Sequence, residues 1–384
     1  MLTCQKHLFD LEPDVHYLNC AYMSPISKAT AAIGAEAVNR KLRPYTITPN
    51  DFFSDVDQLK TLFARLINAE HRDRIAIIPS VSYGTAIVSK NLKTRKGQNI
   101  VVAEAQFPSN VYTWRELAKE RNLIVKTIPY PIEIADGRGK TWNKRILESI
   151  DANTTLVTLG HVHWANGTLF DLKKIGQRCR EVGAIFVIDG TQSVGALPFD
   201  VQDFGVDALI CGGYKTLMGP YSLGYAYLGA YFDNGKPLEE SWMARKDSEN
   251  FSGLLNYQDD YHPLSIRYDM GEKSNFIAVP MGIVALSEIL ERGVSNIQAY
   301  SQDLTKNAIK AWQKVGFWVE NTEFRSQHLF GLQLPPSISS DNLLAKLKEN
   351  KISVSVRGDF VRISTNVYND TTDIQALTEV LLSY

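Results

Sequence analysis

The chain has 384 residues, 44% of them hydrophobic, so it is long enough to bury a large core, and we expect two domains. Its 41 Lys and Arg residues nearly balance its 42 Asp and Glu residues, which argues against a nucleic-acid-binding surface. No apolar stretch is long enough to span a membrane, no secretory signal is recognisable and the four cysteines form no CxxC pair, so we expect a cytoplasmic protein with reduced thiols.

From residue 74 onward, short apolar runs alternate with helical patterns, which is typical of a mainly parallel sheet covered by helices. A helix is expected before this region, at 27–41, and others within it, for example at 112–121 and at 172–182, where Gly183 suits a C-cap. We therefore predict an α/β fold with a seven-stranded sheet. Its strands are expected at 75–78, 100–104, 124–128, 156–159, 184–188, 208–211 and 225–228.

The pattern changes after residue 271. Two long amphipathic helices are expected at 276–292 and 294–315, followed by shorter strands and helices. An α/β unit of this size is a plausible second domain, so we predict a large domain at 31–275 and a smaller C-terminal α/β domain at 276–384. Its strands are expected at 330–334, 352–356 and 361–364, and its helices at 342–350 and from 372.

Residues 184–229 hold the most informative stretch. The apolar run 184–188 ends at Asp189, and the run 206–211 leads into Gly212-Gly213-Tyr214-Lys215. Polar groups at the carboxyl ends of buried strands line a ligand crevice. An acid at one strand end and a lysine at the next suit pyridoxal phosphate (PLP), because the lysine forms a Schiff base with the aldehyde and the acid keeps the pyridine nitrogen protonated. The alternatives are a solvated loop lysine and a helix-capping aspartate.

These motifs resemble a known family. Asp189-Gly-Thr-Gln192, followed by Gly213-Tyr214-Lys215-x-x-x-Gly219-Pro220, is similar to the core of class V aminotransferase-like, fold-type I PLP enzymes, which include cysteine desulfurases, kynureninase and isopenicillin N epimerase-like proteins. The resemblance extends from about Tyr17 to the C-terminus. It implies pyridoxal 5′-phosphate as cofactor, Lys215, Asp189 and His161 as catalytic residues, and an N-terminal segment, 1–30, that packs with the small domain.

The resemblance and the local pattern together give a cofactor site. A strand ends and a helix begins around Ser82, Tyr83 and Gly84, where free N–H groups and the helix dipole favour a phosphate, and Ser82 is also a natural N-cap. In the family, Gln192 approaches the phenolic oxygen. Tyr214 stands where desulfurases have histidine, and its O–H can replace that donor, as in kynureninase.

Two residues are candidates for stacking on the pyridine ring. His161 occupies the position of the desulfurase histidine, and Trp164 occupies the position of the kynureninase aromatic. One is expected to stack and the other to shape the pocket. His161 and His163 could suggest a metal, but no third ligand is evident, so we expect none.

Arg362 matches the family arginine that clamps the substrate α-carboxylate, because a guanidinium fork makes two parallel hydrogen bonds to it. An edge-strand arginine facing water is the alternative. Asn19 and Asn110 are further candidates near the substrate. The segment 267–276 resembles one that a neighbouring subunit supplies to the phosphate, with Ser274 or Asn275 as donor, so we expect a homodimer with shared active sites.

The reaction is less determined than the cofactor. Desulfurases need a cysteine shortly before the carboxylate-binding arginine, and residues 330–362 contain none, so cysteine-dependent sulfur transfer is not expected. We favour an aminotransferase-like enzyme acting on an amino acid or amino-containing metabolite. Epimerisation and carbon–heteroatom elimination remain alternatives, because each begins with proton removal by Lys215. A non-catalytic protein of this fold would be expected to lose Lys215 or Asp189, and both are present.

Overall fold

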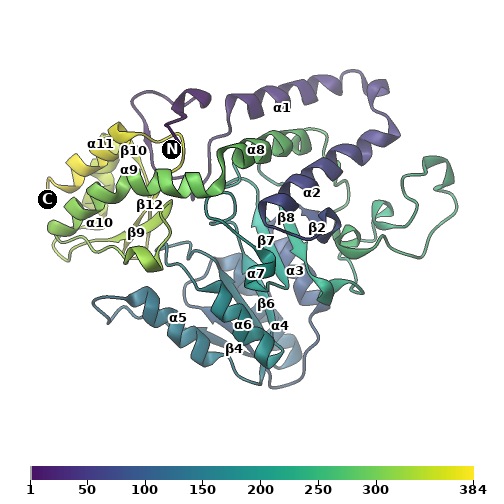
Figure 1. Cartoon of the computed structure of the whole chain (residues 1–384), viewed down its shortest axis with the longest axis horizontal. Coiled ribbons are helices and arrows are strands. Elements are labelled where there is room, and N and C mark those ends of the chain that lie inside the picture. Colours follow the sequence, from purple (N-terminus) through teal and green to yellow (C-terminus); the bar gives the residue numbers. More distant parts are fainter. Residues whose placement is uncertain (1) are drawn as a thin grey trace.

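The computed structural model describes residues 2–384 and is built around a seven-stranded sheet (Figure 1). β8 runs antiparallel to both of its neighbours, and all other pairs are parallel. Every strand predicted for this sheet is present, with ends that differ by at most two residues, and the predicted fold class is confirmed; the strand predicted at 352–356 outside this sheet is instead two short strands, at 352–353 and 355–357, which pair in different sheets. In spatial order the strands are β2 (Ile75–Ile78), β8 (Gly224–Leu228), β7 (Ala208–Gly212), β6 (Ile185–Asp189), β5 (Thr154–Gly160), β3 (Asn99–Ala103) and β4 (Ile124–Ile128).

Helices cover both faces of this sheet, which explains why its strands are almost continuously apolar. Alternate side chains of β2 show the arrangement, because Ile75 and Ile77 belong to one core and Ala76 and Ile78 to the other. The first core includes side chains of α2 (Ser54–Leu66), α5 (Arg138–Ser149), α6 (Leu172–Val182) and α8 (Ala278–Arg292). The second includes α3 (Val81–Asn91) and α4 (Tyr112–Arg121).

A second, smaller sheet has a core of its own that includes Trp312, Phe330 and Leu343. Its antiparallel order is β11 (Ser355–Arg357), β12 (Phe360–Ser364) and β9 (Leu329–Gln333). Side chains of α9 (Val294–Lys314), α10 (Ser340–Glu349) and α11 (Thr371–Leu381) complete that core. Near the N-terminus, β1 (His16–Tyr17) pairs with β10 (Ile352–Ser353), so both ends of the chain lie in this part of the molecule (Figure 1).

Two further helices join these parts. α1 (Lys28–Arg40) and α2 both pack against α8, so α8 covers the large sheet although it follows the expected domain boundary at 276. The boundaries themselves remain predictions. α7 (Val201–Phe204) is a single short helix between β6 and β7. Gly183 closes α6 in the left-handed conformation with φ 72°, as predicted for a glycine C-cap. Within residues 2–384, no helix combines the length and apolarity that a membrane crossing requires.

Candidate active site

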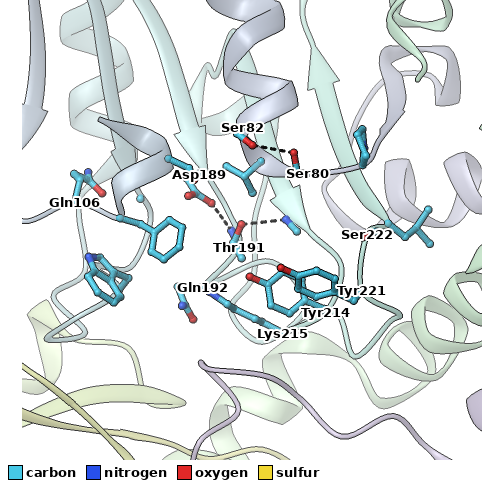
Figure 2. Close-up of a pocket in the computed structure, with 18 of the residues that line it drawn as sticks. Ser80, Ser82, Gln106, Asp189, Thr191, Gln192, Tyr214, Lys215, Tyr221 and Ser222 are labelled. Carbon is cyan, nitrogen blue, oxygen red and sulfur yellow. Dashed lines mark hydrogen bonds between the residues drawn. The ribbon is translucent and has the colours of Figure 1, made fainter. Parts of the chain in front are cut away.

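A cavity of about 280 Å³ opens where β5, β6 and β7 end and α3 begins (Figure 2). The carboxyl ends of parallel strands meet at one edge of a sheet, so side chains distant in sequence converge there. Figure 2 shows Gln192, Tyr214 and Lys215 on one side of this space, with Asp189, Ser80 and Ser82 on the opposite side. The cavity is also lined by Pro79, Val81, Gln106, Phe107, Ser109, Gly160, Val162, Trp164, Thr191, Gly212, Tyr221, Ser222 and Leu223.

Lys215 follows β7 by three residues and is buried, with 6% of its surface exposed. Its Nζ atom lies 5.2 Å from the centroid of the Phe107 ring and 5.5 Å from that of Tyr214. Burial lowers the pKa of Lys215 to about 8, and although Asp189 acts in the opposite direction, Arg362 also lowers it. A lysine held in this way has a substantial neutral fraction near neutral pH, which a nucleophilic amine requires.

Asp189 is the last residue of β6, and its Oδ1 atom accepts a hydrogen bond from the backbone N–H of Thr191 at 3.0 Å. Burial raises the pKa of Asp189, although the Thr191 bonds and the charge of Lys215 oppose the shift. A carboxylate that opens into a cavity and lacks a close cation is costly. A protonated pyridine nitrogen would supply the missing cation, so this position fits the PLP ring.

Thr191 and Gln192 continue from the end of β6 into the cavity wall. The Thr191 hydroxyl accepts from the backbone N–H of Gly212 at 3.0 Å, which holds the ends of β6 and β7 together. The Gln192 Nε2 atom donates to the carbonyl oxygen of Ala21 at 3.1 Å, and its buried Oε1 has no partner among residues 2–384. The structure thus places Gln192 at the cavity, with one amide N–H still free to donate.

The end of the cavity beside α3 differs in detail from the prediction. Ser80, not Ser82, caps the helix, because its Oγ accepts from the Tyr83 backbone N–H at 3.2 Å. Ser82 lines the cavity, and its hydroxyl lies 2.9 Å from that of Ser80. Two hydroxyls at a helix N-terminus suit a phosphate, since the first N–H groups of a helix lack intrahelical acceptors.

Tyr83 and Gly84 do not line the cavity, and their predicted contact with the phosphate remains a prediction. Their backbone N–H groups are both bonded to Ser80, through its hydroxyl and its carbonyl oxygen. A Cβ atom on Gly84 would lie 2.6 Å from Cγ2 of Ile210, so the glycine permits close packing of α3 on the sheet. The sequence pattern located the helix start correctly, and the structure adds that Ser80 is the residue that caps it.

His161 does not line the cavity, so its contact with the cofactor remains a prediction. Its ring packs edge-on against Phe199 and Phe204, with centroid distances of 5.4 and 5.5 Å. Burial lowers its pKa to about 3, so it is neutral at physiological pH. Trp164 does line the cavity, and its indole N–H donates to the carbonyl oxygen of Ala105 at 2.7 Å.

Phe107 is the aromatic wall that the sequence pattern did not identify. It follows β3, whose carboxyl end lies at the same sheet edge, and packs edge-on against Trp164 with centroids 5.4 Å apart. Ala105 has a positive φ of 50°, so a sharp turn precedes this segment. The available signal was the Phe107-Pro108-Ser109-Asn110 segment after a predicted strand. Asn110 points elsewhere: its Oδ1 accepts from Trp114 Nε1 and Thr158 Oγ1, and it does not line the cavity.

Tyr214 and Tyr221 form another wall, with ring centroids 4.6 Å apart at an angle of 62°. Both line the first cavity and an adjoining one of about 320 Å³. The carbonyl oxygen of Tyr214 accepts from the backbone N–H of Ser24 at 3.1 Å, so the N-terminal segment is held at the mouth. The second cavity therefore lies between the two sheets, as its lining residues from both regions indicate.

Arg362 reaches the adjoining cavity from β12 with only 1% of its surface exposed. Its Nη1 atom donates to the carbonyl oxygen of Trp164 at 2.9 Å, whereas Nε and Nη2 have no partner among the described residues. Burial lowers its pKa to about 10, with a further contribution from Arg357. Unpaired buried guanidinium N–H groups are costly, and a carboxylate would satisfy them.

Asn19 lines neither cavity, and its role as a substrate neighbour remains a prediction. Its Oδ1 atom accepts from the Ser355 hydroxyl at 2.9 Å, and its backbone bridges Ser364 of β12. Ala21, Tyr22 and Met23, a few residues further on, line the adjoining cavity instead. Asn19 thus anchors the segment that carries them.

Ser274 and Asn275 do not line the cavity of their own chain. The Ser274 hydroxyl donates to the carbonyl oxygen of Phe52 at 2.5 Å, and the Asn275 side chain accepts from the backbone N–H groups at the start of α8. Their predicted contact is with the phosphate of a second subunit, and it remains a prediction. Among residues 2–384, no cluster of three His, Cys, Asp or Glu side chains is arranged to hold a metal.

Comparison with known proteins identifies the class and then the family. The solved structures of a cysteine desulfurase from Thermococcus onnurineus and of the cystine C–S lyase C-DES superpose with TM-scores of 0.84 and 0.85. The desulfurase is 18% identical in sequence, and its superposition covers 100% of this chain and 98% of the desulfurase. The lyase is 17% identical, and its superposition covers 97% of this chain and 98% of the lyase. These likenesses establish the fold-type I architecture.

The sequence model of the aminotransferase class V family matches residues 46–377, so the chain belongs to that family. It is therefore a PLP-dependent enzyme. Among its relatives, the Bacillus subtilis protein named as the uncharacterized aminotransferase YcbU is 25% identical, over 80% of this chain and 78% of that protein. A probable cysteine desulfurase of Methanothermobacter thermautotrophicus is 27% identical, over 83% and 80%.

Proposed function

We propose that this enzyme acts at the Cα atom of an amino acid, with transamination as the favoured reaction. One observation carries the proposal: Arg362 lines a cavity that Lys215 also lines, and the Nε and Nη2 atoms of its buried guanidinium have no partner among the described residues. A planar carboxylate accepts from such a fork in two parallel hydrogen bonds. A substrate held there by its α-carboxylate would place its amino group and Cα toward Lys215.

The chain's own residues have complementary tasks in this reaction. PLP, when bound, supplies an aldehyde for the amine and a ring that accepts the electrons of a broken bond to Cα. Asp189 would hold a proton at the ring nitrogen, which its buried position favours. Lys215, with a pKa of about 8, would take the proton from Cα and return it at another carbon. Phe107 and Trp164 would restrict the ring and exclude water.

Carbon–heteroatom elimination is the second candidate, because the relatives include probable cysteine desulfurases and the fold is shared with a cystine C–S lyase. These names keep desulfuration among the reactions considered. None of the four cysteines lines either cavity, and Cys20 is buried beside Asn366, whose Nδ2 lies 3.6 Å from its sulfur. Sulfur released here would therefore need an acceptor from outside the two cavities, which favours elimination over transfer to a thiol of this chain.

A homodimer is part of the proposal. Ser274 and Asn275 precede α8 and lie away from their own cavity, while Ile277 and Trp242 nearby are 40% exposed. We propose that a second copy covers this surface and that one of the two polar residues reaches the partner's phosphate site. Sedimentation should give a dimer, and Ser274→Ala together with Asn275→Ala should weaken PLP retention without separating the subunits. A monomer that retains PLP fully would contradict this part.

Spectral titration of the PLP-loaded enzyme with L- and D-amino acids tests the reaction. Transamination predicts a pyridoxamine product that a keto acid reverses, whereas elimination predicts release of ammonia and a keto acid from a substrate with a leaving group. In deuterated water, Cα hydrogen exchange should accompany either reaction. Arg362→Gln should raise KM for the amino acid by about 10- to 100-fold, from the strength of hydrogen bonds to charged groups. The absorption of PLP bound to the Arg362→Gln variant should match that of the wild type. If no amino acid changes the absorption spectrum of the wild type, the proposal is refuted.

A further inference from the structure

The cavity next to Lys215 is strongly cationic. Of the described residues that line it, Lys215, Arg357 and Arg362 carry positive charge, and none is an aspartate or glutamate. The remaining lining residues are mostly aromatic or apolar. They are Ala21, Tyr22, Met23, Phe107, Trp164, Tyr214 and Tyr221. Such a cavity favours a ligand with more negative charge than one carboxylate supplies.

The guanidinium groups of Arg357 and Arg362 both lie near the indole ring of Trp164. Their guanidinium carbons are 5.4 and 5.9 Å from the centroid of Trp164. The hairpin explains the placement: Arg362 pairs with Ser355, so Arg357 is its diagonal neighbour on the same face of β11 and β12. Diagonal neighbours have Cβ atoms roughly 7–8 Å apart, which is close enough for long side chains to contact one ligand.

Neither guanidinium is neutralised. No ion pair joins Arg357 or Arg362 to an acidic residue within 2–384. Arg357 donates to the carbonyl oxygen of Val356 at 2.7 Å, and Arg362 to that of Trp164 at 2.9 Å. Arg357 is partly exposed. The pKa of Arg362 is lowered mainly by its own burial and, second, by the positive charge of Arg357. Two like charges held on one ring repel, and two anionic groups would remove that repulsion.

Resting on the proposed function, we propose that the substrate is an amino acid with an anionic side chain, whose α-carboxylate binds Arg362 and whose second anionic group binds Arg357. Arg362 is assigned the α-carboxylate because it is the more buried and has two unpaired N–H groups. Arg357, at the outer end of the hairpin, faces the side chain. The chemistry fits a carboxylate or a sulfinate, since both are small anions with oxygen acceptors.

The test compares acidic amino acids with their neutral isosteres on the PLP-loaded enzyme. The pairs are aspartate with asparagine and glutamate with glutamine, and cysteine sulfinate distinguishes a sulfinate from a carboxylate. The wild type should prefer the acidic member in kcat/KM by about tenfold or more. Arg357→Gln should bring that ratio close to one, because kcat/KM falls mainly for the acidic member of each pair, whereas Arg357→Lys should retain part of the preference. The control is Arg145→Gln, because Arg145 is a half-buried arginine that lines neither cavity.

A second measurement does not depend on turnover. Calorimetric titration should show that glutarate binds more tightly than butyrate to the wild type and that Arg357→Gln removes the difference. If amino acids react but acidic and neutral members are used equally, or if Arg357→Gln leaves their ratio unchanged, this inference is overturned while the proposed function stands. If no amino acid alters the spectrum, although glutarate binds more tightly than butyrate, the proposed function fails and the anion site remains.

Discussion

The Nζ atom of Lys215 lies 5.2 Å from the centroid of the Phe107 ring, although the two residues follow different strands, β7 and β3. Asp189, at the end of the strand between β5 and β7, lines the same cavity. A flat apolar wall beside a lysine and a carboxylate provides a stacking surface for an aromatic cofactor ring. The loop after β3 thus contributes to the site as much as the strands whose motifs are most recognisable.

Phe107→Ala should therefore weaken PLP retention. Removing the contact between the Phe107 ring and the PLP ring should cost roughly 0.5–1.5 kcal/mol of binding free energy, which corresponds to about a 2- to 10-fold rise in the dissociation constant of PLP. Dialysis followed by absorption measurement gives that constant. His161→Gln is the control, because His161 packs against Phe199 and Phe204 outside the cavity. If the His161 variant loses PLP and the Phe107 variant keeps it, then His161, and not Phe107, is the residue that stacks on the PLP ring.

Reconstitution of the apoenzyme with PLP should depend on pH through Lys215. Only the neutral amine attacks an aldehyde, and burial lowers the lysine pKa from 10.5 to about 8. At neutral pH this corresponds to roughly 300-fold more neutral amine than for an ordinary lysine. The rate of Schiff-base absorption should rise with pH and level off near 8. Lys215→Ala should show no such band while it unfolds as cooperatively as the wild type, and a rate still rising steeply above pH 9 would argue against the lowered pKa.

Asp189→Asn should stabilise the apoprotein and weaken its response to PLP. The folded state holds the Asp189 proton more tightly than the unfolded state, because burial raises the pKa. When the pH rises above the unfolded-state pKa of 3.8, ionisation of the Asp189 carboxyl therefore lowers the stability of the folded state. The uncharged asparagine side chain removes that loss at neutral pH. Thermal unfolding with and without PLP measures both effects. The control is Asp203→Asn on the surface, which should leave the melting temperature unchanged both with and without PLP. An Asp189→Asn apoprotein that melts well below the wild-type apoprotein would contradict the expectation.

Breaking a buried charge cluster beside β2 should be strongly destabilising. The Asp269 Oδ2 atom accepts from Lys60 and Lys273 at 2.7 and 2.8 Å, and Oδ1 accepts from the Ile77 backbone N–H. Burial raises the pKa of Asp269, but the two lysines lower it further than burial raises it. Asp269→Ala leaves two buried cations unpaired and should cost about 3–5 kcal/mol in urea unfolding. Glu116→Ala, which breaks an exposed pair with Lys119, should have little effect, and similar losses in both would refute the estimate.

Some site residues could be placed from local pattern and others could not. Asp189 and Lys215 could be placed together because Asp189 ends one buried strand, Lys215 lies three residues after the next strand of the same sheet, and strand ends converge. His161 also follows a strand, yet its side chain points to the opposite side from Val162, which lines the cavity. Successive residues in extended chain alternate in direction, so a shift of one position moves a side chain from the cavity to the core.

The amino-acid sequence by itself determined the seven strands, the covering helices, the cofactor and the lysine–aspartate pair, because those depend on apolar periodicity and on motifs contiguous in the chain. The tertiary structure decided which aromatic ring faces Lys215 and that Arg357 and Arg362 share Trp164. These relationships depend on the turn at Ala105 and on the β11–β12 register. Turn geometry and strand register arise from contacts between distant segments, so local pattern does not specify them.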